Sequence, residues 1–232
     1  MPAISTPLII ALDYADLPSA LTMADALDPR RCRVKVGKEL FTRVGPAAID
    51  ALHDRGFEVF LDLKFHDIPN TAAGAVEAAA DRGVWMTNVH AGGGRRMMEA
   101  CAKRMSEARY RTHLIAVTVL TSLSDEELDE IGVEGSAAAQ VERLAMLAQQ
   151  SGMHGVVCSA QESARLRDRC GDGFLKVTPG IRPADGEVGD QRRIMTPEAA
   201  LAAGSTHLVV GRAVTQAAMP MEALTAIERS II

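Results

Sequence analysis

The chain has 232 residues, of which 47% are hydrophobic, and carries a formal net charge of −5 at pH 7. A chain of this length and composition can bury one large core, so we expect a soluble globular protein. The acidic balance and the aromatic content of 3% provide neither a basic surface nor stacking residues, so we expect no nucleic-acid partner.

The cysteines and the N-terminus indicate a cytoplasmic protein. Cys32, Cys101, Cys158 and Cys170 have no CxxC spacing, which predicts reduced thiols. The opening sequence MPAISTPLIIALD has no basic segment and too short an apolar run for a secretory signal. No apolar run approaches the roughly 20 residues that span a bilayer, so we expect no membrane association.

Eight short apolar runs alternate with segments of helical periodicity. The runs predict buried parallel strands at 8–12, 33–36, 59–63, 86–90, 114–120, 155–158, 174–178 and 208–211. Segments with a period near 3.6 include 17–27, 72–82 and 97–108. Eight strand–helix units predict the α/β class and a (β/α)₈ barrel.

Several helix starts have recognisable caps. Ser-x-x-Glu sequences beginning at Ser124 and Ser159 are capping boxes, and Thr196 is an N-cap followed by proline. The long connection at 124–152 can hold a short acidic helix and then a longer one. No linker or low-complexity segment divides the chain, so we expect a single domain over 1–232.

The ten residues DLKFHDIPNT at 62–71 follow the third apolar run. Because side chains alternate along a strand, Asp62 and Lys64 should point the same way, with Asp67 in the loop beyond. We expect the Lys64 ammonium to lie between these two carboxylates, which would keep it charged despite burial. A lysine held in this way can stabilise and protonate a carbanion. The alternative is a surface ion-pair network.

Polar residues also end other expected strands, where (β/α)₈ barrels carry their chemistry. These positions are Asp13, Lys35, Asp62, Lys64, Thr121 and Ser122. Lys35 could instead extend its amine to water, and Asp13 could cap the helix beginning near Leu17. On neighbouring strands, however, the Lys and Asp residues of this set and Asp67 would alternate in sign, which is how buried charges are tolerated.

A second polar group follows the seventh and eighth runs, where this fold usually binds phosphate. Gly211 would let backbone N–H groups approach an anion, and Arg212 would add bidentate contacts. The alternative is a helix start with an exposed arginine. The polar segment 182–191, from Arg182 to Gln191, is typical of a lid over a ligand or of an ordinary surface loop.

The remaining polar features favour structural roles. Arg165, Arg167 and Arg169 are expected to form a solvated helix face. His90 and His207 are expected at strand ends with hydrogen-bond partners. Neither an HExxH motif nor a His/Cys cluster indicates a metal, so we expect no metal site.

Together these motifs closely resemble the orotidine 5′-phosphate decarboxylase family, whose reaction belongs to pyrimidine nucleotide synthesis. The resemblance runs nearly end to end and depends on Asp13, Lys35, 62–71, 120–122, 178–182, 190–191 and 209–212, with flanking stretches at 34–41 and 88–94. It implies a (β/α)₈ barrel that acts without a cofactor on orotidine 5′-monophosphate.

The resemblance also implies roles around the base and ribose. Lys64 would protonate C6 of the pyrimidine after CO₂ departs, with Asp62 beside the leaving carboxylate. Lys35 would hold the ribose and the charge array, and Asp13 would bind a ribose hydroxyl. Ser122 would hydrogen-bond the pyrimidine edge, with Thr121 alongside it.

The resemblance further implies a homodimer with shared sites, in which Asp67 and Thr71 reach into the neighbouring subunit's site. Gln191 would bridge the base and the phosphate, with Arg182 at the base of the lid. The residues that would grip the phosphate are Gly211 and Arg212.

Two other functions compete with this interpretation. The first is a metal-dependent sugar-phosphate decarboxylase or aldolase of the same superfamily, which shares the D-x-K-x-x-D motif. Those relatives carry an acidic metal ligand on the second strand, where this chain has Lys35, which would repel a divalent cation. The second is a non-catalytic nucleotide-binding barrel, which would have no need for Lys64 beside carboxylates.

Overall fold

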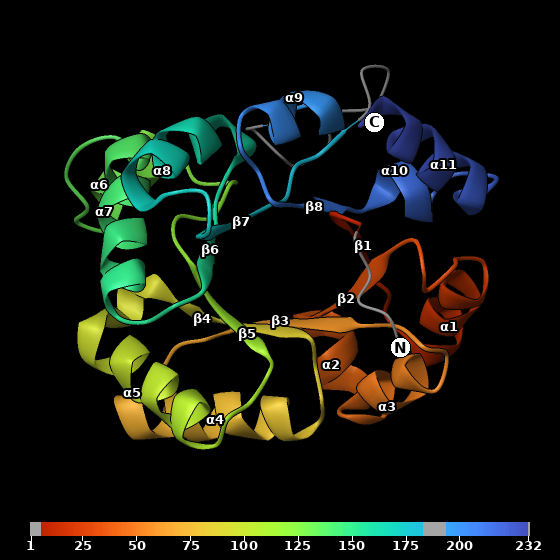
Figure 1. Cartoon of the computed structure of the whole chain (residues 1–232), viewed down its shortest axis with the longest axis horizontal. Coiled ribbons are helices and arrows are strands. Elements are labelled where there is room, and N and C mark those ends of the chain that lie inside the picture. The colour runs from red at the N-terminus through yellow and green to blue at the C-terminus, as the bar shows by residue number, and fades with distance from the viewer. Residues whose placement is uncertain (1–5, 183–193, 232) are drawn as a thin grey trace.

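The computed structural model describes residues 6–182 and 194–231, and these form a closed barrel of eight parallel strands in chain order (Figure 1). The strands are β1 (Leu8–Ala11), β2 (Arg33–Gly37), β3 (Val59–Phe65), β4 (Met86–His90), β5 (His113–Val117), β6 (Gly155–Val157), β7 (Leu175–Thr178) and β8 (His207–Val210). β8 pairs with β1, so the ring has no open edge. The predicted (β/α)₈ barrel is confirmed.

Helices surround the ring of strands on its outer side (Figure 1). They are α1 (Leu17–Asp25), α2 (Lys38–Val44), α3 (Ala47–His53), α4 (Pro69–Asp81), α5 (Gly94–Glu107), α6 (Asp125–Glu130), α7 (Ala137–Gln150), α8 (Ser163–Cys170), α9 (Pro197–Ala202), α10 (Arg212–Thr215) and α11 (Pro220–Ser230), with short 3₁₀ turns η1 (Ala91–Gly93) and η2 (Ala160–Glu162). Within the described ranges, no helix is long and apolar enough to cross a membrane.

Some strands and helices begin or end at residues other than those predicted from the apolar runs, because an apolar residue can be buried without pairing in the sheet. The fifth strand was expected to reach 120 but ends at Val117, because Val119 and Leu120 line a cavity instead of extending the ladder. The helix expected from 72 begins at Pro69, since proline suits the first helical position and apolar periodicity does not report it. Apolar patterns therefore locate these elements better than their ends.

The predicted helix starts are confirmed. Ser124 and Ser159 form capping boxes with Glu127 and Glu162, and the Thr196 side chain accepts from the backbone N–H of residue 199. The connection after β5 holds the short acidic α6 and the longer α7, as expected. Asp16, and not Asp13, caps α1.

Side chains along each strand alternate between the outer layer, packed against the helices, and the interior of the barrel. In β2, Val34 and Val36 pack outward against the helices, whereas Arg33 and Lys35 share the inward face. The barrel interior is filled by a separate cluster of buried residues that includes Ile9, Ala11, Phe60, Met86, Ile115, Val177 and Val209. The interior is thus a packed core with charged residues at its ends.

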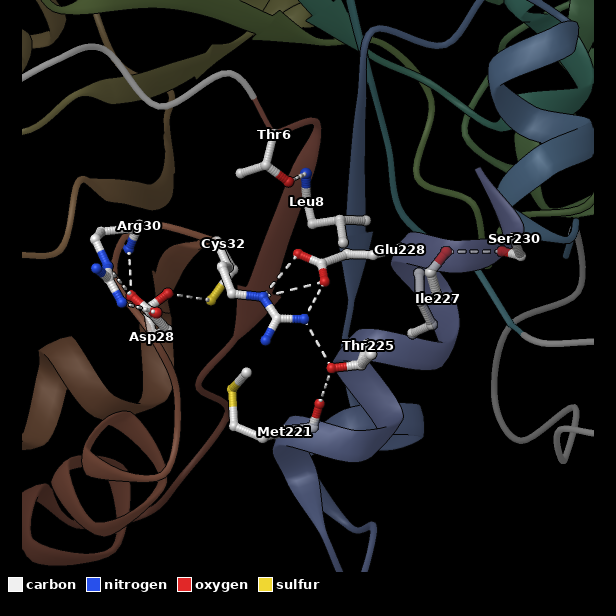
Figure 2. Close-up of polar contacts among 11 residues, drawn as sticks. Thr6, Leu8, Asp28, Arg30, Cys32, Met221, Thr225, Ile227, Glu228 and Ser230 are labelled. Carbon is white, nitrogen blue, oxygen red and sulfur yellow. Dashed lines mark hydrogen bonds and ion pairs between the residues drawn. The ribbon is translucent and has the colours of Figure 1, made fainter. Parts of the chain in front are cut away.

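The C-terminal helix α11 is tied to the segment before β2 (Figure 2). Arg31 Nη2 donates to Thr225 Oγ1 at 2.7 Å, and Arg31 also pairs with the Glu228 carboxylate. Thr225 Oγ1 in turn donates to the Met221 carbonyl at 2.7 Å (Figure 2). These contacts fix α11 beside the segment that leads into β2.

The arginines of α8 were predicted to form a solvated helix face, but two of them form ion pairs with α7. Arg165 and Arg169 both pair with Glu142 of α7, which is buried, and Arg169 Nε lies 2.6 Å from its Oε1. A buried carboxylate needs such partners. Two of the three arginines therefore hold α8 against α7.

Candidate active site

A cavity of about 270 Å³ opens at the carboxyl ends of the strands. The predicted residues Asp13, Lys35, Asp62 and Lys64 line it, together with Thr121, Ser122, Arg182 and Gly211. Apolar side chains such as Phe60, Val117, Val157 and Val209 line other parts of the wall. The structure thus brings most of the predicted site residues to one cavity.

Four charged residues form a chain of ion pairs along β1 to β3. Lys35 Nζ lies 3.1 Å from Asp13 Oδ1 and 3.4 Å from Asp62 Oδ2, and Lys64 Nζ lies 2.7 Å from Asp62 Oδ1. We call Asp13, Lys35, Asp62 and Lys64 the charge array. Its signs alternate, so each inner charge has an opposite charge on both sides.

The sequence predicted that the Asp67 carboxylate would lie beside Lys64, opposite Asp62. Asp67 is exposed, and its Oδ1 accepts from the backbone N–H of Ile68 at 2.6 Å. Within one chain the expected position of Lys64 between Asp62 and Asp67 does not hold, because β3 continues to Phe65 and carries Asp67 past the cavity. The lysine that lies between two carboxylates is Lys35.

Burial and charge oppose each other in the array. Burial lowers the pKa of Lys35, but the carboxylates of Asp62 and Asp13 outweigh it, so the pKa is raised above its ordinary value. Burial raises the pKa of Asp62, but Lys35, Lys64 and a hydrogen bond from Asn88 lower it below its usual range. Both groups therefore remain charged at neutral pH.

The backbone of β3 is irregular where it carries the array. Leu61 pairs with Thr87 of β4 and Phe65 pairs with Val89, so three residues of β3 face one residue of β4. Lys64 has φ +52°, a left-handed conformation that costs a non-glycine residue on the order of 1–2 kcal/mol. Bulges of this kind redirect side chains next to active sites.

Two residues next to the array were not singled out by the sequence patterns. Asn88 of β4 contacts both Asp62 and the Lys64 backbone. At Gly37, a Cβ atom would lie 3.2 Å from Asp13 Oδ1 and 3.3 Å from Lys35 Nζ, so a larger residue would crowd the array. A polar residue inside a buried strand was the available signal for Asn88.

The loops after β7 and β8 border the same cavity. Gly211 is the N-cap of α10 and lines both this cavity and an adjoining one of about 340 Å³, which Arg212 also lines. Arg182 is buried, and its backbone N–H donates to the Met195 carbonyl at 3.1 Å. Gln191 lies outside the described residues.

Thr71, His90 and His207 are not among the described residues that line the cavity. Thr71 is exposed on the first turn of α4, close in sequence to Asp67. His90 Nδ1 accepts from the Gly92 backbone at 3.2 Å, and His207 Nδ1 lies 3.1 Å from Thr206 Oγ1, so both strand-end histidines have hydrogen-bond partners as predicted.

A barrel with an alternating lysine and aspartate array at one side of its mouth and an arginine after the last strand defines a (β/α)₈ enzyme for an anionic small molecule. A sequence model of the orotidine 5′-phosphate decarboxylase / HUMPS family matches residues 6–227. The chain belongs to this family, and the predicted resemblance is confirmed.

Individual relatives agree with the family match. The chain is 70% identical to orotidine 5′-phosphate decarboxylase of Chromohalobacter salexigens over 99% of its own length and 98% of the relative's. It is 59% identical to the protein of that name from Alcanivorax borkumensis, covering 98% and 99%. The crystal structure of orotidine 5′-phosphate decarboxylase from Lactobacillus acidophilus has a TM-score of 0.87 at 40% identity, covering 97% and 98%. The prediction of a carboxy-lyase enzyme is thereby confirmed.

Proposed function

We propose that this protein decarboxylates orotidine 5′-monophosphate to uridine 5′-monophosphate, in pyrimidine nucleotide synthesis, without a metal or cofactor. The observation that carries the proposal is the charge array, in which the Lys64 ammonium lies 2.7 Å from Asp62 at the wall of the cavity. The family and the names of its relatives support the substrate.

Lys64 is the proton donor in this proposal. Loss of CO₂ from C6 leaves an electron pair in an sp² orbital that no adjacent carbonyl delocalises. Stabilisation must then come from a fixed cation and from binding energy elsewhere in the substrate. The Lys64 ammonium supplies that positive charge and then transfers a proton to C6, so that CO₂ and the C6-protonated product leave the site.

The rest of the array maintains the charge of Lys64 and binds the ribose. Asp62 lies beside the departing carboxylate and, through its hydrogen bond, orients the Lys64 ammonium. Lys35, between Asp62 and Asp13, holds both carboxylates in place and contacts the ribose. Asp13, the most exposed member, accepts from a ribose hydroxyl.

The remaining predicted residues bind the base and the phosphate. Ser122 and Thr121 lie on the wall of the cavity and contact the pyrimidine edge. Gly211 and Arg212 bind the phosphate after β8, where a backbone N–H and a guanidinium supply matching donors. Arg182 lies at the base of the segment that includes Gln191, to which we assign the contact between base and phosphate.

We also propose a homodimer with shared sites. Asp67 and Thr71 are exposed on either side of Ile68, whose residue surface is 68% exposed. An exposed apolar side chain flanked by polar ones suits a contact with a second copy. In the dimer, Asp67 would supply the second carboxylate near the partner's Lys64.

The test is a decarboxylation assay with EDTA-treated protein. Loss of the ultraviolet absorbance of orotidine 5′-monophosphate should proceed at full rate after chelation, because the cation in the site is a lysine. A requirement for an added divalent ion would contradict the proposal and favour the metal-dependent relatives. No turnover by folded protein would favour a nucleotide-binding barrel.

A further inference from the structure

Asn88 is a buried polar residue in the strand next to the charge array. It is 0% exposed, and it is the residue of β4 that lies opposite the three-residue bulge between Leu61 and Phe65. Thr87, the preceding residue of β4, donates from Oγ1 to the carbonyl of Leu61, where the bulge begins, at 3.1 Å. The bulge is thus held by side chains of β4 where the backbone ladder is interrupted.

The two ends of the Asn88 amide serve different partners. Its Oδ1 accepts the Lys64 backbone N–H at 2.7 Å, and its Nδ2 donates to Asp62 Oδ1 at 2.7 Å. The same Asp62 oxygen accepts from Lys64 Nζ at 2.7 Å. Because one partner is a donor and the other a carboxylate, a single orientation of the amide satisfies both.

We infer that Asn88 is a positioning residue for the decarboxylation: one amide holds the Lys64 backbone at φ +52° and holds the Asp62 oxygen that orients the Lys64 ammonium. The inference rests on the proposed function. Asn88 is not among the described residues that line the cavity, and its hydrogen bonds reach the Lys64 backbone and Asp62 Oδ1, not the Lys64 Nζ that donates the proton. Its effect therefore passes through Lys64 and Asp62. Its loss should reduce turnover more than substrate affinity.

The chemistry of the amide predicts how each substitution should behave. Asn88→Leu has a similar shape and neither hydrogen-bonding group, so it should lower kcat about 100-fold at every pH. Asn88→Asp keeps an acceptor for the Lys64 N–H but, when ionised, places a second carboxylate against Asp62. When protonated, the introduced carboxyl can again donate to Asp62 and accept from Lys64.

The experiment measures kcat and KM for both variants and wild type between pH 5 and pH 8. Relative to wild type at the same pH, Asn88→Asp should lose about tenfold in kcat at pH 5 and about 100-fold or more at pH 8. The ratio for Asn88→Leu should stay constant, and KM should change by less than about threefold in both variants. A packing role alone would not produce a ratio that depends on pH.

Controls separate the inference from folding and from the proposed function. Gln150→Glu, an exposed amide-to-acid change outside the site, should leave kcat unchanged. Asn88→Ser is smaller and cannot span both partners, and its thermal unfolding shows whether the barrel persists. The inference is wrong if kcat is unchanged, if the Asn88→Asp ratio does not vary with pH, or if all three Asn88 variants lose cooperative unfolding. An inactive wild type would instead overturn the proposed function.

Discussion

Arg33 and Lys35 lie two residues apart on the inward face of β2 and serve opposite ends of the barrel. Both are buried, with exposed fractions of 5% and 8%. Arg33 Nε donates to Glu58 at 2.7 Å and its Nη1 to the Thr6 carbonyl at 2.6 Å, and its guanidinium lies 4.1 Å from the Trp85 ring centre. Lys35 instead lies between two carboxylates at the mouth of the cavity.

The pKa values of Arg33 and Lys35 are shifted in opposite directions. Burial lowers the pKa of Arg33, and Glu58 compensates only in part, whereas the carboxylates around Lys35 raise its pKa. At the amino end, one cation is satisfied by structural groups and an aromatic face. At the carboxyl end, an excess of charged partners faces a cavity. One strand therefore contributes a structural ion pair at one end and, in the proposed function, part of the reactive charge array at the other.

The largest effect expected at the carboxyl end follows from removing the Lys64 ammonium. In the proposed mechanism, Lys64→Ala loses both the proton donor and the cation that stabilises the carbanion, so kcat should fall about 10⁴-fold or more. Decarboxylation of orotidine 5′-monophosphate measures it. Lys103→Ala removes an exposed lysine of α5 and should leave kcat unchanged.

The shared site can be tested with the same variant. Asp67→Ala should also be nearly inactive alone, yet mixed with Lys64→Ala it should regain activity. In a mixed dimer with the proposed shared sites, one of the two sites draws both residues from unmodified copies. Inactivity of a mixture whose subunits have been shown to exchange would remove Asp67 from the partner's site.

The next effect concerns the phosphate group of the substrate. Arg212→Ala should lower kcat/KM by a factor that corresponds to about 2–5 kcal/mol of transition-state stabilisation. A loss of this size is expected when the charged partner of a desolvated anion is removed. Phosphite dianion should partly restore turnover of the truncated nucleoside by wild type, and less so by the variant. Equal activation of both proteins would remove Arg212 from the phosphate site. Arg43→Ala, in an exposed helix ion pair, is the matched control.

The sequence predicted the barrel and the array because both follow from short-range rules. Apolar runs and strand alternation located the eight strands, and Lys35 and Asp62 occupy the strand ends where they were expected. Alternation could not predict the bulge that turns Lys64 to φ +52°, because a register shift depends on pairing with β4. Asn88 was missed for the same reason, since its partners lie more than 20 residues away.

A stability effect should dominate at the amino end. Arg33→Met keeps much of the buried volume but leaves Glu58 and the Thr6 carbonyl without this donor, so the free energy of unfolding should fall by about 1–3 kcal/mol. Urea unfolding measures the change, and kcat/KM should remain within about twofold of wild type. Lys35→Met, the same change two residues along, should instead lower activity more than 100-fold. Similar losses of activity in both variants would contradict the division between the two ends.

The smallest effect concerns the pH dependence of stability at the amino end, where His207 packs near Trp85 with ring centres 5.3 Å apart. Burial, then Arg33 and His113, lower the pKa of His207 to about 4. Below the unfolded pKa of about 6.5, the unfolded chain binds a proton that the folded chain excludes until about pH 4. Stability is therefore lost as pH falls through this window.

His207→Gln removes that proton uptake, so the variant should lose less stability than wild type between pH 7.5 and pH 4.5, by about 1–2 kcal/mol. Urea unfolding at both pH values measures it, and the comparison at pH 7.5, where the histidine is neutral in both states, isolates the cost of the substitution itself. His113 and His154 also have pKa values lowered first by burial, so part of the acid sensitivity should remain in the variant. A difference between the two pH values that is the same in the variant and in wild type would show that His207 does not carry this part of the acid response.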